Sequence, residues 1–197
     1  MADPQAARRI EAASLIAANL LPLLGLVLLR WDIGTLLLLY WAETAVIGLA
    51  TIVEAGVRTH GKALLALPFF LVHAGMFMGV HAVFLTVLFL GGSPSAVLQR
   101  LPGVLLPLLL VAASHAVGVV VHLRQARDVK VGQLVTAFYS RIVLMQFAII
   151  GGGFVLVSLG TPLGSGLILV GGKAALEAFA WLRRKAKDDA AAAPTPA

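Results

Sequence analysis

The chain has 197 residues, of which 60% are apolar and 12% are charged, and its mean hydropathy is +0.97. Soluble domains carry about 25% charged residues, so this composition excludes an ordinary soluble domain and indicates surroundings that are largely lipid. The net charge of +6 comes from short basic runs rather than a long basic face, which argues against nucleic-acid binding, and the absence of cysteine excludes disulfides and thiolate metal sites.

Six apolar stretches divide the chain, each near the length that a helix needs to cross a bilayer. A helix rises about 1.5 Å per residue, so about 20 residues cross about 30 Å of hydrocarbon. The sequence therefore predicts an all-α, polytopic transmembrane helix bundle with six spans, at residues 12–30, 34–56, 63–90, 102–123, 136–159 and 163–182. The predicted transmembrane domain covers residues 12–185, between an N-terminal segment at 1–11 and a disordered tail at 186–197.

The segments between these spans support the division. An arginine pair ahead of the first span resembles the start of a signal peptide, but the apolar run continues to Leu29 without a small-residue cleavage site. We therefore expect a retained first span. Residues 91–95 are rich in glycine, serine and proline and close the third span, and a short amphipathic piece follows to Arg100. Pro162 occupies a position that is preferred at the start of a helix.

The basic residues predict which way the bundle faces. Cytoplasmic segments of membrane proteins carry an excess of Lys and Arg. With the N-terminus inside, eleven Lys and Arg residues fall in cytoplasmic segments, and only Arg30 and Arg100 fall in outer segments. The sequence therefore predicts a multi-pass protein of the cell (plasma or inner) membrane, with both termini in the cytoplasm.

Glycines within the spans predict close helix packing. Gly75 and Gly79 have the spacing of the small-xxx-small motif, and residues 151–153 are all glycine. Such residues let helices approach closely, either within one chain or between two. Close helix packing is a simpler interpretation of these glycines than a hinge, and a homo-oligomer formed through the Gly-rich faces is a further hypothesis.

Several ionisable residues fall inside the predicted spans, where each costs roughly 2.5 kcal/mol or more. They are Glu43, His73, His81, His115, Arg141, Lys173 and Glu177. Four of them, from four different spans, lie at about 12 to 19 Å from the cytoplasmic end by the helical rise, and these are Glu43, His73, His115 and Lys173. The other three lie at different depths. The sequence therefore predicts a polar site near the midplane, inside the bundle.

This set of residues permits several functions. Glu43, His73 and His115 could bind a transition metal such as Zn, Fe or Cu, or the two histidines could be the axial ligands of one haem b. The same residues could instead carry protons or ions in a small transporter or channel. A non-catalytic membrane scaffold is the third hypothesis. The sequence contains no H-E-x-x-H, G-x-S-x-G or P-loop motif, so it leaves open whether the protein is an enzyme.

The charged residues of the last two spans also have a simpler interpretation. Lys173 and Glu177 are four residues apart on one predicted helix, so they can neutralise each other, with Arg141 as a third member. Tyr40 lies three residues before Glu43 and either lines the same site or only packs against it.

Several of these residues carry a resemblance to a known family. The segments Leu39-Tyr40-Trp41-Ala42-Glu43 and His73-Ala74-Gly75, continuing to His81, resemble an uncharacterised family of prokaryotic polytopic membrane proteins, a domain of unknown function. Ser114-His115 and Tyr139-Ser140-Arg141-Ile142 are similar to its later segments. The resemblance covers about residues 20 to 182. It implies no activity, substrate or cofactor.

Overall fold

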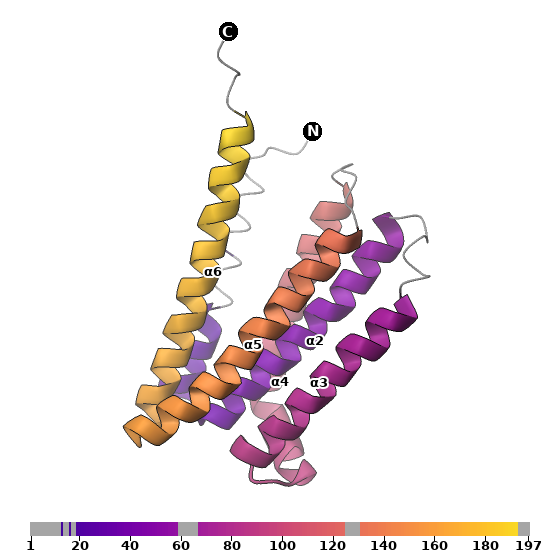
Figure 1. The fold of residues 1–197 in the computed structure, drawn as a ribbon. Helices are drawn as coiled ribbons and strands as arrows, with labels where there is room; N and C mark the ends of the chain where they lie inside the picture. The colour runs from indigo at the N-terminus through magenta and orange to yellow at the C-terminus, as the bar shows by residue number, and fades with distance from the viewer. Residues whose placement is uncertain (1–12, 14–15, 17–18, 59–66, 125–130, 193–197) are drawn as a thin grey trace.

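The chain folds as a bundle of helices in a computed structural model (Figure 1). The structure describes all residues except 1–12, 14–15, 17–18, 59–66, 125–130 and 193–197. Five long helices follow one another, α2 (Ile33–Arg58), α3 (Leu67–Phe89), α4 (Pro94–Arg124), α5 (Val131–Leu159) and α6 (Pro162–Ala192). A shorter apolar helix, Asn19–Leu28, precedes them. No strand occurs in the described part of the chain, so the all-α fold class is confirmed.

The surface of this bundle is apolar. Helices α2 to α6 are each long and apolar enough to cross a membrane. Large side chains such as Phe69, Phe147 and Phe154 are 69 to 73% exposed. Water would penalise an apolar surface of this extent, whereas acyl chains accept it. Composition and surface together indicate that the protein associates with a membrane, and the predicted six spans and their orientation stay predictions.

Helix α2 is the central element of the bundle. It contacts α3, α4, α5 and α6, and Figure 1 shows it among these helices. The run Leu36–Tyr40 explains this position, because its residues are apolar on every side of the helix and none is more than 4% exposed. A helix that is apolar all round belongs in an interior. Trp41 adds a specific contact, since its Nε1 donates a hydrogen bond to the carbonyl of Met78 on α3 at 2.9 Å.

An aspartate caps the start of α2. Asp32 Oδ1 accepts hydrogen bonds from the backbone N–H and the hydroxyl of Thr35, both at 2.7 Å, which satisfies a donor that the first helical turn leaves without a partner. Asp32 Oδ2 forms an ion pair with Arg100 of α4 at 2.9 Å. Partial burial raises the pKa of the Asp32 carboxyl, but the hydrogen bonds from Arg100 and Thr35 outweigh it and lower the pKa overall. The cap therefore also ties α2 to α4.

We expect Asp32 to make stability depend on pH in the acidic range. Because its pKa is lower in the folded protein, the ionised carboxylate stabilises the fold above its ordinary pKa of about 3.9, and this stabilisation is lost as the pH falls through the lower, folded-state pKa. Asp32→Ala should lower the free energy of unfolding at neutral pH by about 1 kcal/mol and should flatten the acid dependence. Denaturant unfolding in detergent across this pH range measures both effects. Asp32→Asn should keep most of the cap, because its amide oxygen can accept the same hydrogen bonds, but it should also flatten the dependence of stability on acid pH. An unchanged acid dependence in both variants would show that Asp32 is not its source.

Glycine and proline mark helix ends as the sequence predicts. Helix α3 ends just before Gly91 and Gly92, which have φ angles of +82° and +77°. These angles lie in the left-handed region that glycine adopts without strain. Gly160, with φ of +63°, follows α5 in the same way. Pro162 is the first residue of α6, as expected.

Two boundaries differ from the prediction. Helix α4 begins at Pro94, so the piece up to Arg100 is part of one continuous helix that also contains Pro102 and Pro107. Internal prolines of this kind are tolerated where neighbouring groups satisfy the freed carbonyls. Helix α6 continues to Ala192 and thus enters the segment predicted as a disordered tail, in keeping with the high helix propensity of its alanines.

The predicted glycine faces divide between packed and open positions. A Cβ atom on Gly152 of α5 would lie 3.0 Å from Leu169 of α6, so this glycine permits close packing inside the bundle. Gly75 and Gly79 have no atom within 4 Å of a Cβ built on them. Their motif is therefore not used for packing within the described chain, and the predicted homo-oligomer through this face stays a prediction.

Candidate functional site

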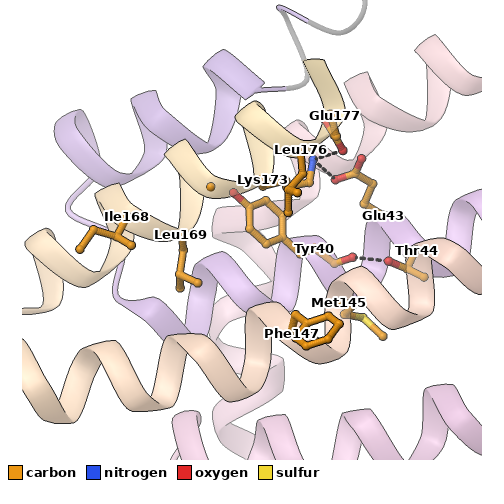
Figure 2. A pocket seen from close by; sticks show the side chains of 11 residues that line it. Tyr40, Glu43, Thr44, Met145, Phe147, Ile168, Leu169, Lys173, Leu176 and Glu177 are labelled. Carbon is orange, nitrogen blue, oxygen red and sulfur yellow. Dashed lines mark hydrogen bonds and ion pairs between the residues drawn. The ribbon is translucent and has the colours of Figure 1, made fainter. Parts of the chain in front are cut away.

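Three charged residues meet between α2 and α6. The Nζ atom of Lys173 lies 2.8 Å from Oε1 of Glu177, one turn along α6, and 3.4 Å from Oε2 of Glu43 on α2 (Figure 2). The side chains of Lys173, Glu43 and Glu177 are 11%, 5% and 13% exposed. We call these three residues the charge cluster. One ammonium group therefore faces two carboxylates in a largely buried place.

Neighbouring polar and aromatic groups surround this cluster. Asn19, in the helix that precedes α2, donates a hydrogen bond from Nδ2 to Oε2 of Glu177 at 2.9 Å. The Nζ atom of Lys173 lies 5.0 Å from the ring centre of Tyr40, a cation–π distance. Tyr40 is 4% exposed, and its hydroxyl has no hydrogen-bond partner within the described part of the chain. Tyr40 therefore belongs to the site predicted around Glu43.

A partly open cavity of about 170 Å³ adjoins the charge cluster. Its polar lining comes from α2 and α6, namely Tyr40, Glu43, Thr44, Lys173 and Glu177. Its apolar lining comes from α5 and α6, namely Met145, Phe147, Ile168, Leu169 and Leu176, with Gly172 beside them. Figure 2 shows these residues around one space, with the ion pairs at one end. The cavity thus combines a charged end with an apolar body.

The three residues of the charge cluster do not balance one another in charge. Among the described residues, two carboxylates and one ammonium group leave one negative charge in excess. A net charge is costly in a low-dielectric interior. Arg141 was predicted as a further member and lies on α5 one turn before Met145, but its side chain is outside what the structure describes.

His73 has partners other than the charge cluster. It lies on α3, where its Nδ1 is within hydrogen-bond distance, 2.5 Å, of the hydroxyl of Tyr139 on α5. Its ring stacks on Phe69 at a centroid distance of 5.2 Å. His73 does not line the cavity beside Glu43. The sequence predicts a similar depth for His73 and Glu43, but the two residues have different partners. Depth does not specify the direction in which a side chain points from its helix.

His81 and His115 also lie away from the cavity lining. His81 on α3 is 3% exposed; its Nδ1–H donates to the carbonyl of Phe77 at 2.6 Å, and its Nε2 has no partner in the described part of the chain. His115 is half-buried on α4 and takes part in an interaction within the chain. No group of three or more His, Asp or Glu among the described residues is placed to hold a metal ion. The metal and haem hypotheses gain no support from these positions and stay predictions.

Two polar residues of this site were not predicted from the sequence, and neither was its apolar lining. Asn19 contacts Glu177, and Thr44, whose hydroxyl donates to the carbonyl of Tyr40 at 2.9 Å, lines the cavity. A lone amide in an apolar run is itself a signal, because buried amides in membrane helices are usually hydrogen-bonded across helices. Thr44 gave no such signal, since a threonine can bond to its own helix.

Residues 1–194 match the model of a family described as "Family of unknown function (DUF6498)". The chain belongs to this family. Membership of an uncharacterised family is thereby confirmed, over more of the chain than the resemblance covered. No curated protein and no solved structure matches the chain. The description of DUF6498 names no function, so the charge cluster and its cavity are the features that bear on what the protein does.

Proposed function

We propose that the protein is a small membrane transporter or channel in which the charge cluster exchanges a proton or another monovalent cation. The supporting observation is that one lysine faces two buried carboxylates beside a cavity. Ionisable residues inside a membrane are costly and commonly mark ion pathways or proton relays. A carboxylate of the charge cluster can take up a proton or a cation and release it when the cavity gains access to water.

The position of the site agrees with this proposal. Lys173 lies near the middle of the apolar stretch Leu163–Arg183 of α6. Transport sites lie near the midplane because this position can be opened to either side in turn. The proposal includes the six spans and the cytoplasmic termini, which rest on the excess of eleven cytoplasmic over two outer Lys and Arg residues.

A flux measurement tests the proposal. The purified protein is reconstituted into liposomes that contain a pH-sensitive dye, and a pH gradient is applied with and without a monovalent-cation gradient. We expect protein-dependent flux, and we expect Glu43→Gln to lower it at least tenfold, because the amide cannot exchange a proton and leaves Lys173 and Glu177 as a balanced pair.

Glu54→Gln provides the matched control. Glu54 is also on α2 and is 7% exposed, but it does not line the cavity. Its variant should retain the flux. Absence of any protein-dependent flux of protons or monovalent cations, or an equal loss in both variants, would contradict the proposal.

The alternatives make different predictions for the same purified sample. A metal or haem protein would show bound metal by elemental analysis or a Soret band, and either signal would be lost in His73→Ala or His115→Ala. A scaffold would lose folding in Glu43→Gln without a separate loss of flux. The transport proposal expects a folded Glu43→Gln variant that lacks exchange.

A further inference from the structure

We infer that the cavity is a binding site for a neutral, lipid-soluble carbonyl compound whose head is about the size of one ring, and that the Tyr40 hydroxyl donates a hydrogen bond to its carbonyl oxygen. The site goes beyond the proposed ion exchange and does not depend on it. Its support comes from a buried hydroxyl without a partner, from the opening of the cavity and from the size of the cavity.

The hydroxyl of Tyr40 is a buried polar group without a partner. Tyr40 is 4% exposed, and its hydroxyl forms no hydrogen bond within the described part of the chain. A buried tyrosine hydroxyl usually has a partner, because an unbonded one has lost its hydration without compensation. Tyr40 lines the cavity, and Figure 2 shows its hydroxyl turned toward α6, with the carboxylates of Glu43 and Glu177 beyond Lys173. A ligand in the cavity is therefore placed to supply the missing partner.

The other polar groups of the cavity lining already have partners. Thr44 donates its hydroxyl to the carbonyl of Tyr40, and Lys173 forms ion pairs with Glu43 and Glu177. The Tyr40 hydroxyl, by contrast, has an O–H to donate. A carbonyl oxygen accepts a hydrogen bond and brings no donor of its own, so one bond from Tyr40 satisfies both groups. An alcohol would bring an O–H that needs a further acceptor.

The cavity opens on the apolar outer surface of the bundle. Phe147 of α5 and Ile168 and Leu176 of α6 line the cavity, yet they are 70%, 52% and 52% exposed. Side chains that do both frame its opening, which therefore lies between α5 and α6. Residues 168–176 occupy the middle of the apolar stretch Leu163–Arg183. In a membrane this part of the surface meets acyl chains rather than water, so a ligand reaches the opening through the bilayer and has to be soluble in lipid.

The size of the cavity limits the head of the ligand. A cavity of roughly 150 Å³ holds one benzene ring, and the cavity here measures about 170 Å³. Acetophenone, a benzene ring that carries one small ketone group, is therefore a suitable probe. α-Methylstyrene has almost the same shape but carries a methylene group in place of the carbonyl oxygen, so the two probes differ in the hydrogen bond that they can accept.

Binding of the two probes to the full-length protein in nanodiscs tests the inference. Ligand-observed NMR measures each affinity, and empty nanodiscs give the partition into the bilayer, which is subtracted. Tyr40→Phe keeps the ring and removes the hydroxyl. It should weaken acetophenone binding about fivefold, the effect of one hydrogen bond, and should leave α-methylstyrene binding unchanged, which also shows that the variant keeps its cavity.

Infrared spectroscopy observes the hydrogen bond directly. The carbonyl stretch of bound, isotope-labelled acetophenone should lie at a lower frequency in the parent protein than in Tyr40→Phe, because donation from the hydroxyl weakens the carbonyl bond. 1-Phenylethanol tests the carbonyl class. After the same correction for partition, it should bind more weakly than acetophenone, because its own O–H is left without an acceptor.

Two neighbouring glycines supply a matched pair of variants that test the location. A Cβ atom on either Gly171 or Gly172 would meet nothing within 4 Å, but of these two glycines only Gly172 lines the cavity. Gly172→Leu should fill the cavity, so that binding of acetophenone and of α-methylstyrene is lost. Gly171→Leu should leave both affinities unchanged, which controls for the effect of a leucine on the folding of α6.

Each outcome decides a separate element of the inference. If Tyr40→Phe changes the affinities of acetophenone and α-methylstyrene equally, or leaves the carbonyl stretch where it was, the hydrogen bond from Tyr40 is wrong. If 1-phenylethanol binds as tightly as acetophenone, the carbonyl class is wrong. Equal effects of Gly171→Leu and Gly172→Leu overturn the location, and failure of both acetophenone and α-methylstyrene to bind the parent protein overturns the site as a whole. The flux measurement is unaffected by any of these results.

Discussion

Replacement of Lys173 by methionine is expected to lower the free energy of unfolding by about 3–5 kcal/mol. The substitution removes the ammonium group that forms ion pairs with the carboxylates of Glu43 and Glu177. Methionine has a similar length and volume, so packing beside Tyr40 is largely kept and the loss reports the charge. Breaking a buried ion pair is costly because the remaining charge stays buried without compensation. Equilibrium unfolding in mixed detergent micelles measures the change.

A triple variant separates this charge effect from packing. Lys173→Met combined with Glu43→Gln and Glu177→Gln should recover most of the lost stability, because a neutral group of similar shape can replace a buried ion pair at little cost. The recovered protein should still lack proton or cation exchange. A Lys173→Met variant as stable as the parent, or a triple variant no more stable than the single one, would show that the charges do not interact as the geometry indicates.

This pair of variants bears on why the cluster exists. A neutral core of the same shape would serve stability about as well as the three charged groups do. Charged residues in membrane helices are costly and usually mark a pathway or a binding site. If the triple variant folds but does not exchange ions, the charges serve function rather than folding, which is the central claim of the transport proposal.

The helices were predictable because bilayer-length apolar runs and their glycine and proline ends follow from local sequence. The span predicted at 34–56 corresponds to α2 at Ile33–Arg58, and α6 begins at the predicted Pro162. The contact between Glu43 and Lys173 also agrees with the depth argument, since helical rise alone places them at a similar level. The ion pair between Lys173 and Glu177 was predictable because residues four apart lie on the same face of a helix.

The partners of the histidines were not predictable in the same way. Helical rise gives the depth of a residue but not the direction in which its side chain points, nor the order of helices around the bundle. His73 shares a depth with Glu43, yet it faces Tyr139 because α3 packs on α5 as well as on α2. Asn19 was missed for a related reason. Its contact with Glu177 joins residues 158 positions apart, and only the packing of the first helix near α6 brings them together.

The second large effect is expected at Gly34, where α2 meets the end of α3. A Cβ atom there would lie 2.5 Å from the carbonyl oxygen of Phe89 and 2.7 Å from Cδ2 of Leu90. The Leu90 side chain can rotate away, but the backbone carbonyl cannot. Gly34→Ala should therefore cost about 1–3 kcal/mol of unfolding free energy, although alanine has the higher helix propensity.

Gly79→Ala on α3 is the control for that propensity. A Cβ atom on Gly79 meets nothing within 4 Å, so the substitution should stabilise the protein by up to about 1 kcal/mol. Both variants are compared by unfolding in the same micelles, and equal stabilisation by the two would contradict the close approach.

Gly34 lies about two turns before Tyr40 and Glu43 on one rigid helix. A shift of α2 that relieves the clash would also move Glu43 relative to Lys173, so Gly34→Ala should reduce the exchange that depends on Glu43, whereas Gly79→Ala should not.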